Sequence, residues 1–280
     1  MIAGARRRHG VAAVRYALLI AAAVVLALPF GYMLSTSLKS HTLLLEYPPR
    51  LIPSHPTVDN YVQAWSANNF GRYFLNSSFV AVATTAGTVL LASMMAYGFA
   101  RFRFPGKGVL FGMVIVGLTI PTMLLIIPQF LLAKNLGLLD SLPGLIPFYV
   151  GTQVAFSTFL LRAFFEQIPG ELDEAMTIDG GGAWRRYWNL AVPLSRPALA
   201  TCAIFTFLGS WDEFVWALTV INDESKRTLP IGIALFHGQH GTSWGLVFAA
   251  SLIAVVPVIV VYVVFQRHLV TGLTSGALKS

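Results

Sequence analysis

The sequence predicts an all-α protein that crosses a lipid bilayer about six times. Hydrophobic residues make up 56% of the 280 residues and charged residues only 11%, which is about half the charged share of soluble domains. The hydrophobic residues come in unbroken blocks that match the roughly 20 residues a helix needs to cross about 30 Å of hydrocarbon. Such blocks favour helices, because a helix satisfies its own backbone hydrogen bonds where water is absent.

Six blocks have the required length. Five of them carry no charged side chain: residues 16–34, 79–100, 109–133, 142–161 and 243–265. The sixth, residues 197–220, is interrupted by the adjacent acids Asp212 and Glu213. Pro121 and Pro128 predict a kink in the third block.

Positive charge predicts the orientation. With a cytoplasmic N-terminus, 13 of the 19 Lys and Arg residues fall on cytoplasmic segments, the positive-inside pattern. We therefore expect a cytoplasmic N-terminal tail (1–15), a six-helix transmembrane domain (16–265) and a cytoplasmic C-terminal tail (266–280). The basic start also suits a cleavable signal peptide, but the length of the first block favours an uncleaved span.

This layout predicts outer loops at residues 35–78, 134–141 and 221–242, the first with turn signals at Pro48 and Pro49. The inner loops are the short connection 101–108 and the longer segment 162–196. Five of the twelve acidic residues lie in this longer segment. A single elaborated loop of this kind predicts a docking site for another molecule.

The segment 162–196 reads as a helix, a glycine turn and a second helix. The first helix follows Pro169 and covers residues 171–178, with Leu172, Ala175 and Met176 on one face. The run Asp179-Gly180-Gly181-Gly182 ends it, and we expect positive φ there. Four positions share the apolar face of the second helix: Trp184, Tyr187, Trp188 and Ala191. Pro193 and Pro197 mark its end.

Read as letters, residues 174–197 are EAMTIDGGGAWRRYWNLAVPLSRP. They resemble the EAA loop of permease subunits of binding-protein-dependent ABC importers, whose pattern is E-A-A, three residues, G, nine residues, I-x-L-P. Glu174, Ala175, Gly180 and Pro193 match that pattern at the right spacing. The departures, Met176, Leu190 and Val192, all keep apolar character.

The likeness covers essentially the whole chain and is strongest to the carbohydrate-uptake, maltose-type branch. It includes the run LLRAFFEQIPGELDEA at 160–175 and the later WDEF at 211–214. The resemblance implies that the loop enters a groove of a cytoplasmic ATPase. The residues it assigns to this coupling are Glu174, Ala175, Met176, Asp179, Gly180 and Pro193.

The resemblance also implies partners and a location. The chain would pair with a second, similar permease as a heterodimer, with two ATPase subunits and with an extracytoplasmic solute-binding protein, in a bacterial-type inner membrane among lipids. No cofactor is expected in this chain, and ATP and Mg²⁺ would belong to the ATPase. The chain contains no G-x-x-x-x-G-K-[ST] motif, so it is not expected to be an enzyme.

Ionisable residues inside a membrane span usually face a cavity or a partner. Asp212 and Glu213, with Trp211 beside them, are candidates for the pathway of a hydroxyl-rich solute. Gln153, in the least apolar span, is another. The alternative for these residues is helix packing, or a gate held against the partner permease.

Other interpretations fit less well. A pair of interfacial helices would favour basic faces, whereas the first helix of the loop is acidic. A stand-alone secondary transporter or channel would show an internal repeat, and an intramembrane hydrolase would need converging acids. His237 and His240 are too few for a metal site, and no basic stripe predicts nucleic-acid binding. The transported solute stays open.

Overall fold

The computed structural model describes residues 2–40, 52–53, 55–238 and 241–277, and these residues are almost entirely helical. The predicted turn at Pro48 and Pro49 lies outside them. A two-residue antiparallel pair joins β1 (His237–Gly238) to β2 (Gly241–Thr242). The chain divides into two compact units, Met1–Asn68 with Ile233–Ala254, and Asn69–Gly232 with Val255–Ser280. The predicted helical fold class is confirmed at this level.

The first unit contains α1 (Ile2–Ser37), α2 (Asp59–Ser66), the β1–β2 pair and the start of α13 (Trp244–Ala277). Asn60 of α2 donates from Nδ2 to the backbone oxygens of Ser37 (2.8 Å) and Lys39 (2.7 Å). A Cβ at Gly245 would lie 2.9 Å from the Asn60 amide. The small residue therefore lets α13 begin directly against α2.

The terminal helices extend beyond the predicted spans. α1 begins at Ile2 and so includes most of the predicted N-terminal tail, and α13 continues to Ala277 through the predicted C-terminal tail. Residues 278–280 lie outside the described chain. No proline interrupts residues 2–15, and Arg and Ala are good helix formers, so the helix continues into the basic segment.

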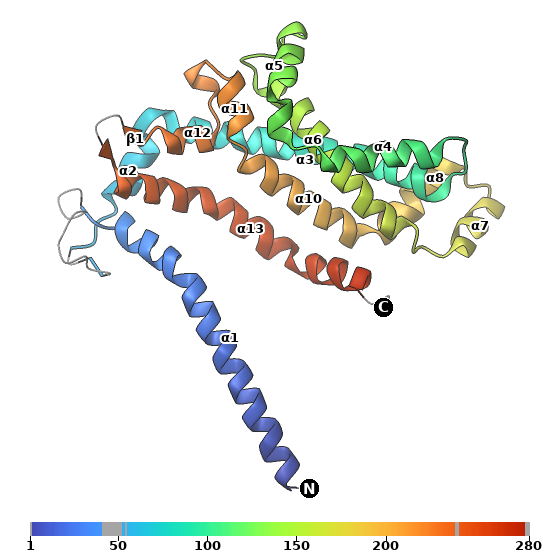
Figure 1. The fold of residues 1–280 in the computed structure, drawn as a ribbon, viewed down its shortest axis with the longest axis horizontal. Coiled ribbons are helices and arrows are strands. Elements are labelled where there is room, and N and C mark those ends of the chain that lie inside the picture. The colour runs from blue at the N-terminus through green and yellow to red at the C-terminus, as the bar shows by residue number, and fades with distance from the viewer. Residues whose placement is uncertain (1, 41–51, 54, 239–240, 278–280) are drawn as a thin grey trace. The chain divides into compact units, whose positions relative to one another are not determined.

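The second unit is built on α3 (Phe70–Arg101), α6 (Leu142–Phe165) and α10 (Arg196–Trp211), which pack together along their lengths (Figure 1). Small side chains share their common core: Ala92 and Ala96 of α3, and Ala198 and Cys202 of α10. Small residues let membrane helices approach closely where water supplies no hydrophobic driving force. The remaining elements of this unit are attached to the two ends of this bundle, called below the Phe70 end and the Arg101 end after α3.

The third predicted span is broken rather than gently kinked. It consists of α4 (Lys107–Thr119), a 3₁₀ turn η3 (Thr122–Leu125) and α5 (Ile126–Asn135), and the two halves meet at 96°. The break lies at Ile120 and Pro121, where the proline restricts the preceding residue to extended backbone. The expected kink is confirmed at Pro121, whereas Pro128 is accommodated inside α5.

The predicted continuous helix over residues 197–220 was wrong. α10 ends at Trp211, residues 212–214 are not helical, and α11 (Val215–Val220) is a separate short helix. The Glu213 side chain accepts hydrogen bonds from the first backbone N–H groups of α11. A side chain that caps a helix in this way favours a helix start over a helix interior.

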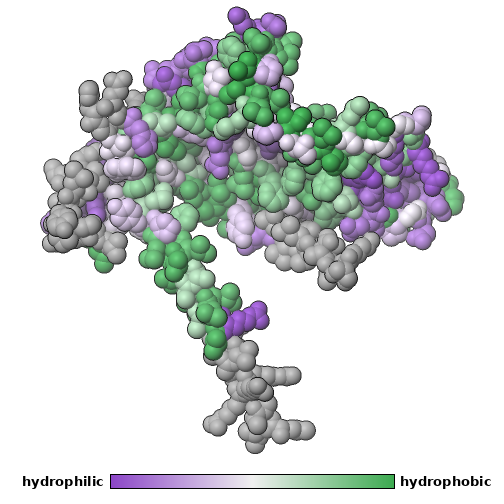
Figure 2. Space-filling model, in the orientation of Figure 1, coloured by the Kyte–Doolittle hydropathy of each residue, from purple (hydrophilic) through white to green (hydrophobic). Residues whose placement is uncertain are grey.

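Four helices in the described chain are long and apolar enough to cross a membrane: Val14–Ser37, Phe70–Arg101, Leu142–Phe165 and Trp244–Gln266. The number reaches six if two bent pairs each count as one span, α4 with η3–α5, and Ala183–Leu194 with α10. Hydrophobic surface covers much of the second unit on the face in Figure 2, and hydrophilic residues gather at its Arg101 end. Exposed apolar surface of this extent is typical of a bilayer-embedded protein.

Candidate functional site

The helix α7 (Gly170–Ile178) follows α6 and ends in a glycine turn, as predicted. Gly180 has φ +75° and its N–H donates to Thr177 O (3.0 Å), while Gly181 N–H donates to Met176 O (2.7 Å). These are the two bonds of a Schellman motif. A Cβ at Gly181 would lie 2.6 Å from Met176 O, whereas one at Gly182 would meet open space. The turn therefore needs glycine at 180 and 181 but not at 182.

The second arm of the loop is one helical segment with an irregular middle: α8 (Ala183–Arg186), a π-helical turn η4 (Tyr187–Ala191) and α9 (Val192–Leu194). Pro193 lies inside it rather than at its end, because the wider π turn precedes the proline, which has no N–H to donate. The predicted apolar face is only partly correct. Tyr187 and Ala191 are buried, but Trp184 and Trp188 are exposed.

Arg101, the last residue of α3, holds α7 to the bundle. Its Nε lies 3.3 Å from Asp173 Oδ2, and its Nη2 donates to Ile168 O at 2.6 Å. The two charged side chains are only 16% and 14% exposed. Because a buried ion pair leaves an uncompensated charge when one partner is removed, this contact is a strong link between α3 and α7.

Apart from that link, α7 presents its side chains outward. None of its residues is buried in the described chain, Glu174 and Ala175 are exposed, and Ile178 is 86% exposed. Leu172 is also exposed. α7 has nine residues, and a helix of this length gains little stability from propensity alone.

Glu213 occupies the break between α10 and α11. Its carboxylate accepts hydrogen bonds from Tyr149 OH (2.5 Å), Trp216 N (2.7 Å) and Ala217 N (3.1 Å). Asp212, its neighbour, is exposed at the end of α10. The two acids therefore have different surroundings, and only Glu213 is fixed by contacts to α6 and α11.

The other predicted pathway residues pack inside the bundle. Trp211 is buried, stacked on Phe207 with ring centroids 5.6 Å apart and edge-on to Phe74 at 5.5 Å. Gln153 of α6 donates from Nε2 to Ser210 Oγ (3.0 Å). These contacts tie α3 and α6 to α10 where the latter ends.

Glu213 lines a cavity of about 150 Å³ that is partly open to the surroundings. Its walls come from η3 and α5, from α6, and from the break before α11. The lining side chains with polar groups include Gln129, Tyr149, Thr152 and Trp216. Two broken helices thus meet around one polar cavity.

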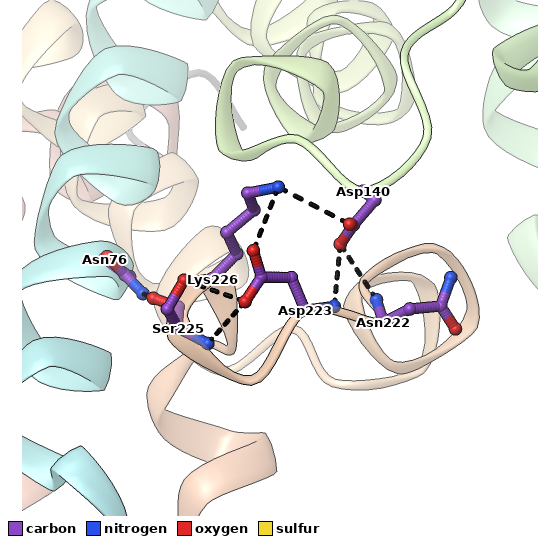
Figure 3. Close-up of polar contacts among 6 residues, drawn as sticks. All are labelled: Asn76, Asp140, Asn222, Asp223, Ser225 and Lys226. Carbon is purple, nitrogen blue, oxygen red and sulfur yellow. Dashed lines mark hydrogen bonds and ion pairs between the residues drawn. The ribbon is translucent and has the colours of Figure 1, made fainter.

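At the Phe70 end, a set of side chains called here the polar clamp joins two loops to α3; it consists of Asn76, Asp140, Asp223, Ser225 and Lys226 (Figure 3). Asp140 Oδ1 accepts from the backbone N–H groups of Asn222 (3.0 Å) and Asp223 (2.9 Å). Lys226 Nζ lies 3.4 Å from Asp140 Oδ2 and 3.2 Å from Asp223 Oδ2. The clamp thereby joins the loop before α6 to the loop after α11.

Asn76 completes the clamp from α3. Its Nδ2 donates to the backbone oxygen of Ser225 (3.0 Å), inside the 3₁₀ turn η5 (Glu224–Lys226), and to that of Arg227 (2.9 Å), between η5 and α12 (Leu229–Ala234). Asp140 itself has φ +51°, a left-handed conformation that Asp tolerates better than most residues. The two predicted outer loops 134–141 and 221–242 therefore meet, as do the two predicted inner loops at Arg101.

The clamp shifts the pKa values of its charged groups. The Asp223 backbone N–H, followed by that of Asn222 and by Lys226, holds the pKa of Asp140 below its usual value. The Ser225 hydroxyl and N–H do the same for the pKa of Asp223, and the Asp223 carboxylate raises the pKa of Lys226. All three groups are charged at neutral pH, so the contacts persist there.

Of the predicted pair His237 and His240, the structure describes only His237. His237 Nδ1 lies 3.2 Å from Thr242 Oγ1 and its ring packs edge-on against Trp244. His240 lies outside the described residues. Among the residues that the structure describes, no cluster of three or more His, Cys, Asp or Glu could hold a metal ion.

Several residues of these sites were not singled out from the sequence, among them Arg101, Asp140 and Tyr149. Arg101 carried a weak signal, as a basic residue directly after a span that faces the acidic loop. Asp140 and Tyr149 carried none, because their partners lie more than 60 residues away in the sequence.

Comparison with known proteins gives consistent matches. The profile of the family "binding-protein-dependent transport system inner membrane component" matches residues 88–275. The chain is 39% identical over 270 residues to the diacetylchitobiose uptake system permease protein of Streptomyces coelicolor, covering 96% of this chain and 89% of that one. It is 35% identical to the trehalose transport system permease protein of Mycobacterium tuberculosis, covering 90% of this chain and 92% of that one.

A solved structure shares the fold. It is a bacterial ABC transporter involved in the import of the acidic polysaccharide alginate, and the matched chain has a TM-score of 0.79 and 24% sequence identity. The match covers 91% of this chain and 95% of that chain.

Proposed function

This chain belongs to the family of inner membrane components of binding-protein-dependent transport systems, and from that membership we propose that it is the permease subunit of an ABC importer that carries a saccharide into the cell. The named relatives are permeases for diacetylchitobiose and trehalose. The mechanistic part of the proposal depends on α7 and its glycine turn, because α7 is an exposed helix attached to α3 by a largely shielded ion pair.

The proposed topology has six spans with both termini in the cytoplasm. The two bent pairs each cross once, and α7 to α9 lie on the cytoplasmic side as a coupling helix pair. Two pairs of loops support this alternation. Loops 101–108 and 162–196 meet at Arg101, and loops 134–141 and 221–242 meet at the polar clamp. Single cysteines test it in a Cys202→Ser background: Ile178→Cys should react with an impermeant thiol reagent from the cytoplasm, and Asn222→Cys from outside.

ATP hydrolysis, with ATP and Mg²⁺, belongs in this proposal to two separate ATPase subunits, and this chain is not an enzyme. Glu174, Ala175, Met176 and Asp179 contact the ATPase groove, while Gly180 and Pro193 set the angle of the two arms. A second permease completes the pathway, and a solute-binding protein delivers the solute from outside. Of the proposed pathway residues, Asp212 and Glu213 meet the solute in this proposal, and Trp211 and Gln153 support them by packing.

Replacing Gly180 tests the coupling. Gly180→Val should abolish ATP-driven uptake of radiolabelled disaccharides in cells that express the complete transporter, because a β-branched residue at φ +75° costs about 1–2 kcal/mol or more and opens the turn. Membrane insertion and co-purification of the ATPase should persist.

Gly182→Val is the matched control, since Gly182 has φ −65° and a Cβ there meets open space. It should transport like the wild type. Normal uptake by Gly180→Val would contradict the coupling role, as would equal losses in both variants.

A further inference from the structure

The cavity beside Glu213 forms where two helices break. η3 follows the 96° bend between α4 and α5, and residues 212–214 separate α10 from α11. Both breaks contribute side chains to the same cavity, with α6 as its third wall. Within a membrane, backbone that leaves the helix is tolerated only where it is buried in protein or lines an aqueous cavity. The paired breaks therefore favour a cavity that holds water or solute rather than lipid.

Its walls combine aromatic faces with hydrogen-bonding groups. Phe148, Tyr149 and Trp216 supply the aromatic surface, and Gln129 and Thr152 supply an amide and a hydroxyl. The volume of about 150 Å³ is that of a cavity that holds one six-membered ring, and the lining is mostly apolar with a few placed polar groups, as in small-ligand sites. This mixture suits a sugar ring, which has hydroxyl groups at its edge and C–H groups on its faces.

One lining side chain has an unused donor. The indole Nε1 of Trp216 is buried and has no hydrogen-bond partner among the described residues, while the residue is 6% exposed. Its ring packs on Phe148 at 4.8 Å. Buried indole N–H groups usually have an acceptor. A small movement of the Trp216 ring on ligand binding would let its N–H donate to an oxygen of the ligand.

Charge makes the cavity selective. The Glu213 carboxylate already accepts three hydrogen bonds, which fix its position and leave room for about one more donor. Among the residues that line the cavity in the described structure, none is Lys or Arg. A solute carboxylate would therefore meet a fixed negative charge with no counter-charge in the cavity wall.

We propose that this cavity is a binding subsite for a neutral sugar ring of the transported solute, and that Glu213 excludes acidic sugars from it. The proposal rests on the importer function above and deepens it. Gln129 and Thr152 bind ring hydroxyl groups, the aromatic residues cover a ring face, and the Glu213 carboxylate accepts a hydrogen bond from one hydroxyl group while it repels a carboxylate.

The test is binding of two matched probes to the purified transporter complex in nanodiscs, without its solute-binding protein. The probes are methyl α-D-glucoside and methyl α-D-glucuronide, which differ in a hydroxymethyl group against a carboxylate. Titration by saturation-transfer NMR should give a Kd for the glucoside at least about tenfold lower than that for the glucuronide.

Two variants test the cause of that preference. Gln129→Arg adds a positive charge to the cavity wall and should bring the two Kd values within about threefold of each other; Gln129→Leu, the neutral control of similar size, should not. Glu213→Gln removes the repelling charge and should also bring the Kd values of the two probes closer together. Gln167→Arg, an exposed position at the Arg101 end, should leave the ratio unchanged.

Three results would overturn the subsite: equal binding of both probes to the wild type, no binding of either probe, or a ratio unchanged in both Gln129→Arg and Glu213→Gln. ATP-driven uptake is measured on the same wild-type complex. If uptake is intact while the probes fail, the subsite is wrong and the importer function stands. If the wild-type complex shows no ATP-driven uptake, the importer function itself is wrong.

Discussion

The two ends of the α3–α6–α10 bundle differ in how the chain holds its loops. At the Phe70 end, the polar clamp joins the loop before α6, the loop after α11 and Asn76 of α3 through several hydrogen bonds and ion pairs. At the Arg101 end, α7 buries none of its described residues and is linked to α3 through Arg101 and Asp173.

This difference indicates that the two ends have different functions. Many polar contacts between distant loops make one end a frame that keeps its geometry. A short exposed helix with one largely shielded ion pair can move as a body about its glycine turn, and the ion pair transmits that movement to α3. The predictions below separate the two ends, in order of decreasing effect.

Breaking the α7 link should have the largest effect on function. Asp173→Arg places two positive charges together where the side chains are about 15% exposed, so ATP-driven uptake should fall by more than about tenfold. The double exchange Arg101→Asp with Asp173→Arg should recover a substantial part of the uptake, because it restores an ion pair of opposite sense.

The matched control is the Arg162–Glu166 pair near the same end, whose side chains are 24% and 44% exposed. Exposed pairs contribute about 1 kcal/mol or less, so Glu166→Arg should change uptake less than about twofold. Equal effects of Glu166→Arg and Asp173→Arg, or no recovery in the double exchange, would contradict the role of Arg101 and Asp173 as a mechanical link.

Replacing Asp140 of the polar clamp should lower the stability of the protein without changing how transport is coupled to ATP hydrolysis. Asp140→Ala deprives two backbone N–H groups of their acceptor and places Ala at φ +51°. We expect the thermal unfolding temperature of the purified complex to fall by about 2–4 °C. The ratio of solute transported to ATP hydrolysed should stay close to that of the wild type.

Asp140→Asn provides a graded control. Asn tolerates the left-handed conformation and keeps an acceptor oxygen, so it should lose only the contact with Lys226 and shift the unfolding temperature less than Ala. If either variant lowered the ratio of solute transported to ATP hydrolysed and left the unfolding temperature unchanged, the distinction between the two ends would be contradicted.

The smallest expected effect is the pH dependence of the clamp. Asp140 and Asp223 have lowered pKa values, so their stabilisation is present above the usual Asp pKa of about 3.9 and is lost as pH falls through the lower folded-state values. Lys226 has a raised pKa, so its part is present below about pH 10.4 and is lost above that. The gap in unfolding temperature between wild type and Asp140→Asn should be constant from pH 5 to 9 and should close below about pH 4.

Much of the fold followed from the sequence because the bilayer imposes simple rules on length and composition. The long spans corresponding to α1, α3, α6 and α13, the helix α7 and the glycine turn at Gly180 were predicted from hydrophobic length, helical period and turn residues. These signals are local, and each predicted span lies within the corresponding helix or within one residue of it, although α1, α3 and α13 are longer than predicted.

The features that the sequence did not predict depend on distant contacts. The break at Asp212 to Phe214 was missed because hydrophobicity alone favours a continuous helix, whereas Glu213 caps α11 and binds Tyr149 of α6. The exposure of Trp184 and Trp188 was not predicted either, because the helical period indicates which residues share a face but not whether that face is covered. The ion pair of Arg101 with Asp173 joins residues 72 positions apart in the sequence.

Cross-linking of α7 to the ATPase tests the central claim most directly. Ala175→Cys is placed on the exposed face of α7 in a Cys202→Ser background, with Asn222→Cys as the control at the Phe70 end, and each is treated with a short bifunctional thiol reagent in inverted membrane vesicles. We expect Ala175→Cys to cross-link to the ATPase subunit and to stop uptake until the cross-link is cleaved. Failure of Ala175→Cys to cross-link while Asn222→Cys does so would contradict the account.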